Sequence, residues 1–304
     1  MQNLMQKINF TPEEQTFVIN LYQSLSIDVI AQIEALKQQY LHPVGETPTV
    51  NLDTKAKLTA LAESNGIHPY SLHLLFLLLC APQIPKGYEE KGWDIKYAYN
   101  LLMDIRYKLT ECENCYHVIG ISTFEWFYRH FLLNRFALGY FQYDPITWDL
   151  DAEYHFGDIH LAKGDPVYKI HIPSAGKMTR ETRLASYCAA HDFFGYKKGE
   201  PVALFCRSWL LYEGYRSVYP MNSNLYDFMD DFELFWHGET EQFSDAWRVF
   251  NCPYNGDTAV LPSETTLQRN FIEYINNGGK FGSGAGVVIC DGERILNNKR
   301  DNAC

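Results

Sequence analysis

A short loop in the middle of the chain has the residue types of an anion site. Residues 170–194 read IHIPSAGKMTRETRLASYCAAHDFF: an apolar strand pattern, a run of small residues with one lysine, then a helical pattern. Thr179 has the side chain of a helix N-cap, and Glu181 falls in the first turn, where a carboxylate complements the helix dipole. The free amides of such a first turn can bind a phosphate or pyrophosphate. The residues expected to form this site are Ser174, Ala175, Gly176, Lys177, Met178 and Thr179.

The loop composition alone does not specify a ligand, because small residues also fill strand-to-helix turns that bind nothing. The loop contains neither the GxxxxGK[ST] pattern of a P-loop nor the dinucleotide motif GxGxxG. A second glycine-rich run, residues 278–286 (GGKFGSGAG), precedes a strand pattern rather than a helix, so it lacks the amides of a phosphate cradle. We interpret this second run as a flexible hairpin or a bulge beside a pocket.

Two groups of cysteine and histidine residues are further candidates for chemistry. Cys112 and Cys115 form a CxxC motif with His117 nearby, but a structural zinc site needs four ligands and no second pair follows. Ordinary thiols therefore explain this motif better than zinc. Cys188 and His191 are three residues apart on the expected helix and could form a nucleophile–base pair of a hydrolase. No third, orienting group is visible, so a core cysteine is the favoured interpretation.

The composition excludes several classes of protein. The 304 residues carry a net charge of -11, which repels polyphosphate backbones, so no nucleic-acid partner is expected. The N-terminal stretch MQNLMQKINFTPEEQ has no apolar core of a signal peptide. The most apolar run, residues 72–81, falls short of the roughly 20 residues that cross a bilayer. We expect a soluble cytoplasmic protein with no membrane partner and with reduced thiols among its eight cysteines.

Residues 1–133 have helical patterns throughout. Thr11 begins a capping box with Pro at the first helical position, and apolar spacing continues from residue 17 to residue 36. Further helix starts are expected at Asp53, Pro69, Asp94 and Thr123.

Strand patterns dominate from residue 134 onward. Three antiparallel-type strands are expected between residues 135 and 173, with a hairpin turn at Lys163-Gly164-Asp165. The helix expected after the small-residue loop follows, and then strands and helices alternate. Strands are expected in residues 201–211, 243–250 and 286–290, and helices in residues 222–235 and 263–277. This order predicts an α+β fold: a helical N-terminal domain, residues 1–133, and a mixed, mostly antiparallel sheet flanked by helices, residues 134–304.

Four motifs in this second half also carry a family resemblance. HIPSAGKMT, CRSWLL, NSNLYDF and LPSETTLQRNF, followed by GSGAG, occur in the order and spacing of the GNAT-like acyltransferase-domain proteins. In that family a helical domain precedes an N-acetyltransferase-like domain. The chain resembles the family well over residues 134 to 290 and in outline over the helical half.

The resemblance implies a binding mode for acetyl-CoA or another acyl-CoA. A central strand would splay from its neighbour, the acyl-CoA would lie between them, and its pyrophosphate would bind the loop at residues 174–179. The chain departs from the usual acetyltransferase signature, which has further glycines where this loop has Gly176 alone, and Ala175 narrows the room for a pyrophosphate. Arg207 stands where the family has a histidine before Ser-Trp. A non-catalytic binding protein with a degenerate GNAT-like domain is therefore the alternative function.

Acyl transfer to an amine requires a base that accepts a proton and an acid that returns one to the departing thiolate. His171 is the first choice for the base because it adjoins the loop, with His155 and His160 as alternatives. The general acetyltransferase pattern places a tyrosine acid near Tyr226 or Tyr219, and Tyr226 is preferred.

The acceptor is expected to be an amine on a small molecule or peptide, and no metal is required. An Asn-Ser-Asn sequence before a helix could bind this acceptor or could equally cap the helix. The candidate substrate-binding residues are Ser208, Trp209, Asn222, Ser223, Asn224 and Arg269.

Overall fold

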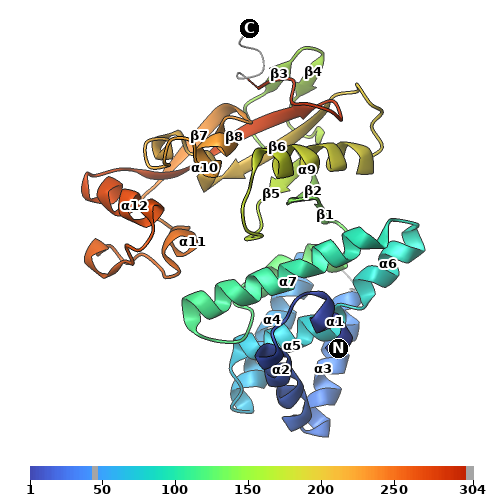
Figure 1. Cartoon of the computed structure of the whole chain (residues 1–304). Coiled ribbons are helices and arrows are strands. Elements are labelled where there is room, and N and C mark those ends of the chain that lie inside the picture. Colours follow the sequence, from blue (N-terminus) through green and yellow to red (C-terminus); the bar gives the residue numbers. More distant parts are fainter. Residues whose placement is uncertain (43–46, 299–304) are drawn as a thin grey trace. The chain divides into compact units, whose positions relative to one another are not determined.

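The chain folds into two structural units of different class, which are coloured from blue to red along the sequence in Figure 1. The computed structural model describes residues 1–42 and 47–298. The first unit comprises Met1–Phe136, and the second begins at Ala137. Each unit has its own buried core, so each is described by itself.

The regular elements of the first unit up to residue 131 are all helices or 3-10 turns within the described residues. Its elements are α1 (Gln2–Lys7), α2 (Pro12–Ser24), α3 (Ile27–Leu41), α4 (Thr47–Ser64), α5 (Pro69–Cys80), α6 (Gln83–Lys91), α7 (Ile95–Tyr116), the 3-10 turn η1 (Phe124–Phe127) and α8 (Tyr128–Phe131). The capping box at Thr11 is confirmed: its hydroxyl accepts from the amide of Glu14, and the Glu14 carboxylate accepts from the amide of Thr11. The helix starts predicted at Pro69 and Asp94 are also confirmed.

Two helix boundaries in this unit differ from the prediction. The apolar pattern between residues 17 and 36 belongs to two helices, because the chain is extended at Leu25 and Ser26 and the Ser26 hydroxyl caps α3. Asp53 does not start a helix but lies inside α4, where it pairs with Lys57 one turn later at 2.6 Å. Apolar spacing alone does not reveal a break of two residues, because the helical period resumes after it.

The second unit is a mixed sheet with helices. Its strands are β1 (Phe136–Leu138), β2 (Phe141–Thr147), β3 (Tyr154–Phe156), β4 (Ile159–Leu161), β5 (Pro166–His171), β6 (Val202–Ser208), β7 (Glu233–Thr240) and β8 (Phe281–Cys290). Its helices and 3-10 turns are α9 (Arg180–Phe193), η2 (Trp209–Leu211), η3 (Glu213–Tyr215), α10 (Asn224–Met229), α11 (Ala246–Phe250), η4 (Thr258–Val260) and α12 (Thr266–Asn276).

The strands form one six-stranded sheet in the order β1-β2-β5-β6-β8-β7 and a separate β3–β4 hairpin. β2 pairs with β5, β6 with β8 and β7 with β8 in antiparallel register, whereas β5 and β6 are parallel. The α+β class and the mostly antiparallel sheet predicted from the sequence are therefore confirmed.

Four local predictions in this unit are wrong. The helix predicted over residues 222–235 is only the short helix α10. Strand β7 begins already at Glu233, because the aromatic residues of β7 pair along β8 instead of continuing the helix. Residues 243–250, predicted as a strand, contain helix α11, since a short apolar run fits the strand period and the helical period equally well. The turn at Gly164 has the expected positive φ, but it joins strands of different sheets, so it is not a hairpin. The glycine run is not a flexible hairpin but enters strand β8; of the two alternatives, the bulge has support, because the register of β7 shifts between Leu234 and Trp236, opposite Gly286 and Ala285.

Close packing explains the glycines of β8. A Cβ atom added at Gly284 would lie 1.9 Å from the carbonyl oxygen of Leu211, and one at Gly282 would lie 2.5 Å from the carbonyl oxygen of Gly238. No side chain larger than hydrogen fits at such distances. The glycines therefore allow η2 and β7 to approach β8.

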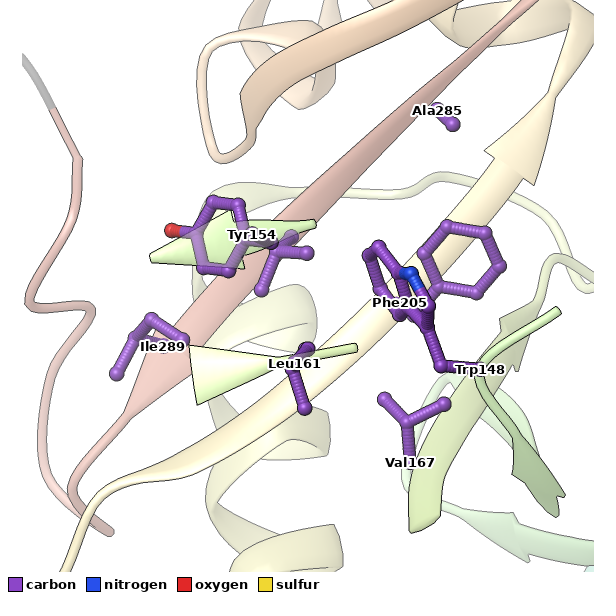
Figure 2. Packing of buried hydrophobic residues seen from close by; sticks show 8 residues of the cluster. Trp148, Tyr154, Leu161, Val167, Phe205, Ala285 and Ile289 are labelled. Atoms are coloured by element: carbon purple, nitrogen blue, oxygen red, sulfur yellow. The ribbon is translucent and has the colours of Figure 1, made fainter. Parts of the chain in front are cut away.

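The two faces of the sheet are covered by different elements. Figure 2 shows Tyr154 and Leu161 of the β3–β4 hairpin packed with Trp148 and Phe205 on one face. This cluster consists of Trp148, Tyr154, Leu161, Val167, Phe205, Ala285, Val287 and Ile289. On β2, Phe141 and Tyr143 point to the opposite face, where Phe141 stacks on Tyr187 of α9. The hairpin and α9 thus enclose the sheet from its two sides.

Helix α9 is fixed to α10 through a fully buried arginine. The Arg183 guanidinium donates to both carboxylate oxygens of Asp231 and, at 2.7 Å, to the carboxylate of Asp227. Burial alone would lower the pKa of Arg183, but the hydrogen bonds and charge of Asp231 and Asp227 outweigh it and raise this pKa. Arg183 therefore stays charged, and it holds α9 to the α10 segment through one fully buried ion pair, with Asp231, and one partly exposed ion pair, with Asp227.

We predict that the two carboxylates differ in their effect on stability. Asp231 is 1% exposed and Asp227 is 29% exposed, so Asp231→Ala removes the only fully buried carboxylate partner of Arg183 among the described residues, while Asp227→Ala is the matched control. Asp231→Ala should lower the free energy of unfolding by about 3–5 kcal/mol. Asp227→Ala should cost about 1 kcal/mol. Urea denaturation measures both, and equal losses in the two variants would contradict the assignment.

Candidate functional site

The central feature of the second unit is the place where β5 and β6 separate. Their parallel register covers only Tyr168 opposite Leu204 and Lys169 opposite Phe205, although β5 continues to His171. β6 continues to Ser208 and remains paired with β8 over that whole length. Within the described part of the chain, no strand pairs with the β5-facing edge of residues 206–208. Backbone groups on that edge can hydrogen-bond an extended ligand that enters between the strands.

The loop between β5 and α9 is held by two hydrogen bonds to its carbonyl groups. The Tyr140 hydroxyl donates to the carbonyl oxygen of Gly176 at 2.8 Å, and Arg183 donates to that of Met178 at 3.1 Å. A trans peptide directs its N–H opposite to its C=O, so the amides of Lys177 and Thr179 point away from these donors. The loop therefore presents amides on the side opposite its anchors.

The conformation of the loop suits a close approach to its backbone. Gly176 has a φ of 92°, a left-handed value that favours glycine, and nothing lies within 4 Å of the position a Cβ would take. Ser174, Gly176 and Lys177 are exposed. Thr179 caps α9 by accepting from the amide of Thr182 at 3.3 Å, as the sequence predicts. The loop accordingly fits a pyrophosphate with respect to space and backbone polarity.

The start of α9 already stabilises one negative charge. Glu181 is exposed, and the hydrogen bonds from its own backbone amide and from the Thr179 hydroxyl lower the pKa of its carboxyl group. A bound phosphate would compete with this carboxylate for the same donors. Glu181 is thus both a sign of the anion-binding character of the helix start and an internal competitor for it.

At the end of β5, His171 forms a pair with a carboxylate. The ring nitrogen Nε2 lies 2.9 Å from Oδ2 of Asp144 on β2. Both side chains are largely buried, with exposed fractions of 16% and 4%. The register places Gln142 opposite His171, so Asp144, two residues along β2, is a diagonal neighbour on the same face. A carboxylate that accepts from Nε2–H fixes the ring and leaves the lone pair of the neutral imidazole on Nδ1.

Asp144 is a site residue that the sequence patterns did not single out. Its signal is present in FQYDPI, where an acidic residue interrupts an apolar strand pattern. Burial of a carboxylate requires a partner, so such a residue indicates a pair, but the partner follows only from the strand register.

Tyr226, the predicted acid, lies on α10 and is half-buried. The Arg216 guanidinium lies over its ring, with Cζ at 5.1 Å from the ring centroid. Because Asp227 and Asp231 hold α10 against α9, the position of Tyr226 depends on the Arg183 ion pairs. Tyr219, the alternative acid, is buried, and burial raises the pKa of its hydroxyl well above the usual value.

Several predicted substrate-binding residues make structural contacts. Ser208 caps η2, and Ser223 caps α10 by accepting from the amide of Tyr226 at 3.2 Å. Trp209 packs edge-on against Phe243 and Tyr215. The remaining residues also have local roles: Asn222 adopts a φ of 67° before α10, Asn224 is the first residue of that helix, and Arg269 donates to the carbonyl groups of Ser263 and Glu264.

The structure separates the other histidine candidates from this site. His155 and His160 lie on the β3–β4 hairpin, outside the six-stranded sheet, and both are exposed. His191 is buried, and its ring nitrogens contact the carbonyl oxygen of Glu200 and the carboxylate of Asp192. His191 is therefore occupied by structural partners rather than poised as a base for Cys188.

The CxxC motif lies on helix α7. Cys112 is fully buried, and burial raises the pKa of its thiol to about 12. Zinc requires a thiolate, so this environment opposes metal binding at Cys112.

Comparison with known families matches both units. Residues 135–288 match the GNAT-like C-terminal domain, and residues 1–133 match the N-acyltransferase N-terminal domain. A search of curated protein sequences finds no match. Among the described residues, every helix is too short or too polar to traverse a lipid bilayer.

Solved structures with the same fold are acyltransferases. One, an acyltransferase in complex with decanoyl-CoA and teicoplanin, is 16% identical with a TM-score of 0.69, and the match covers 94% of this chain and 86% of that chain. A second, in complex with decanoyl-CoA, is 18% identical with a TM-score of 0.69 and the same coverage. A third, an acyltransferase mutant in complex with octanoyl-CoA, is 15% identical with a TM-score of 0.68 and the same coverage.

A helical unit followed by a sheet with separating parallel strands defines the class of two-domain proteins with a GNAT-like fold. The chain belongs to the family that combines the N-acyltransferase N-terminal domain with the GNAT-like C-terminal domain. The resemblance seen in the sequence motifs is thereby confirmed.

We predict that Cys188 is reactive for a structural reason. The neighbouring Cys290 thiol lowers the pKa of Cys188, whereas the pKa of Cys290 is raised. Cys290→Ala removes this neighbour, so the pKa of Cys188 should rise and its thiolate fraction at neutral pH should fall. Alkylation of Cys188 by iodoacetamide, followed by mass spectrometry, should slow several-fold, while alkylation of Cys252 serves as the internal control. An unchanged rate at Cys188 would contradict the proposed effect of Cys290 on the Cys188 thiol.

Proposed function

We propose that the chain is an acyl-CoA-dependent N-acyltransferase, which moves an acyl group from a thioester to an amine. The observation that carries the proposal is the separation of β5 from β6 directly before a loop that presents backbone amides. Membership of the GNAT-like family supports it. The acyl-CoA is a substrate here, and its two ends require different surroundings: an extended thioester arm and a charged pyrophosphate.

The proposed binding mode uses backbone groups for both ends. The arm of the acyl-CoA lies between the end of β5 and residues 206–208 of β6, where its amides pair with the strand edge. The pyrophosphate binds the amides of the loop at residues 174–179, with Lys177 adding a positive charge. Nothing lies within 4 Å of the position that a Cβ would take at Gly176, so the loop leaves room for these backbone contacts although Ala175 replaces a glycine.

The acyl group of the proposed cosubstrate is not restricted to acetyl. The solved structures with this fold carry decanoyl-CoA or octanoyl-CoA, so medium-chain acyl-CoA is tested beside acetyl-CoA. One of them is in complex with teicoplanin, a fact consistent with an amine acceptor on a small molecule or peptide.

The proposed chemistry needs two proton transfers. Nδ1 of His171, directly or through water, accepts a proton from the amine nitrogen as that nitrogen attacks the thioester carbonyl. The C–S bond then breaks, the amide forms, and the thiolate of CoA takes a proton from the Tyr226 hydroxyl. Asp144 is a positioning residue that orients His171 and stabilises its protonated form through Nε2–H. The products are the amide and free CoA.

Substitutions in the loop should change the affinity for CoA in opposite directions. Lys177→Ala removes a charge, so it should weaken binding about fivefold, which corresponds to about 1 kcal/mol. Glu181→Gln removes the competing carboxylate and should strengthen binding by a similar factor. Calorimetry with decanoyl-CoA, acetyl-CoA and CoA measures these changes.

The matched control for the loop is Lys197→Ala, because Lys197 is an exposed lysine beyond the other end of α9. The affinity of the Lys197→Ala variant for CoA should equal that of the wild type. Absence of binding by the wild-type chain at high micromolar CoA and acyl-CoA would overturn the enzyme proposal and favour the non-catalytic binding protein.

Substitutions at the His171–Asp144 pair should separate catalysis from binding. His171→Gln should lower kcat about 100-fold or more, because it removes the base. Asp144→Asn should lower kcat about tenfold and shift the acidic limb of the kcat–pH profile, with KM for acyl-CoA nearly unchanged. His237→Gln, at an exposed histidine on β7, is the control and should retain wild-type kcat. Full activity of His171→Gln would contradict the assignment of the base.

A further inference from the structure

A cluster of potential metal ligands lies on the β3–β4 hairpin, outside the proposed acyl-CoA site. It consists of Glu153, His155 and His160, and each offers one ligand atom within 4.8 Å of the others. Nε2 of His155 lies 3.4 Å from Oε2 of Glu153, and Nε2 of His160 lies 3.2 Å from the same oxygen. All three side chains are exposed to solvent, so an ion can reach them directly.

These separations match the edges of a zinc coordination tetrahedron. Zinc binds histidine nitrogen and carboxylate oxygen at roughly 2.0–2.2 Å, so two ligand atoms of a regular tetrahedron lie about 3.4 Å apart. Two of the three ligand–ligand distances in the cluster already have this length. An ion placed between the three atoms therefore requires little rearrangement. The remaining coordination position would be filled by water.

The hairpin holds the two histidines in place before any ion binds. His155 is directly opposite His160 in the antiparallel register, and their rings stack with centroids 4.3 Å apart. Their neighbours Tyr154 and Leu161, also opposite each other, point inward into the apolar cluster of Figure 2. Since alternate residues of a strand point to opposite faces, burial of this inner pair fixes the outer pair.

The carboxylate is positioned by the segment that precedes β3. The Trp148 indole donates to the carbonyl oxygen of Ala152 at 2.8 Å, which holds the backbone beside Glu153. The Tyr154 hydroxyl donates to Glu233 at 2.7 Å, which fixes the hairpin to β7. The ligands thus come from a supported segment rather than from free loops.

We propose that Glu153, His155 and His160 form a binding site for a divalent transition-metal ion of the zinc class. Two neutral imidazoles and one carboxylate are ligands that zinc accepts, and imidazole also suits copper and nickel. The bound ion links β3, β4 and the preceding segment, and so stabilises the hairpin that covers the sheet. The proposal is independent of acyl transfer, because the site lies on the hairpin and not at the end of β5.

Calorimetric titration of the full chain with Zn²⁺ tests the proposal. Wild-type protein should bind one equivalent of Zn²⁺ that the double variant His155→Ala/His160→Ala does not bind. The affinity for this equivalent should be micromolar. The variant keeps every cysteine, so zinc held by thiolates contributes equally to both titrations. Glu153→Gln should retain the site with affinity reduced by about tenfold or more. His237→Ala, at an exposed histidine on β7, should match the wild type.

Thermal denaturation supplies the second readout. Zn²⁺ should raise the Tm of the wild type and of His237→Ala, and it should raise the Tm of the double variant by less. Because the substituted side chains are exposed, the variants should fold, and their Tm without metal verifies this. Equal zinc stoichiometry and equal Tm shifts in the wild type and the double variant would overturn the proposal.

Discussion

The buried charge of Arg183 is the constraint on which the second unit depends. A guanidinium with no exposure to solvent must be compensated, and Asp227 of α10 and Asp231, just after that helix, provide the compensation. The same side chain donates to the carbonyl oxygen of Met178, at the end of the loop before α9. One arginine therefore couples three elements: the helix that carries it, the helix of Tyr226, and the loop. The geometry of the loop follows from this coupling, because its amides face away from the groups that hold its carbonyls.

The second constraint is the short parallel register of β5 and β6. The central strand β6 gains its hydrogen bonds from β8 along its full length, so it can lose those of β5 after Phe205 without losing its place in the sheet. The glycines of β8 contribute to this arrangement, since Gly284 lets the chain after β6 turn closely over β8 at Leu211. The strand separation, the amide-bearing loop and the His171–Asp144 pair all lie at the same end of β5. This concentration of features in one place, within a GNAT-like domain, is the basis for the proposed acyl transfer.

The sequence predicts those features that depend on neighbouring residues. It does not predict features that depend on contacts between residues far apart in the chain. The cap at Thr11, the cap at Thr179 and the strand-to-helix turn follow from local residue types, and the structure contains them. The start of β7 does not follow, because residues after Asp231 become a strand only by pairing with β8. Asp144 has no local signature of its role, since its partner is 27 positions away and the strand register brings the two together. The role of Arg183 is likewise hidden in the sequence, as Asp231 lies 48 positions further along the chain. Local chemistry located the loop, whereas the tertiary fold determined which side chains support it.

In the proposed complex, acyl-CoA lies between the separating ends of β5 and β6. A crystal structure of the chain with a non-hydrolysable thioether analogue of decanoyl-CoA would show whether it does. We expect the arm of the analogue beside residues 206–208, the pyrophosphate on the amides of residues 174–179, and the acyl carbonyl within reach of His171. Electron density for the analogue at another place on the protein, with no density between the ends of β5 and β6, would contradict the proposed binding mode.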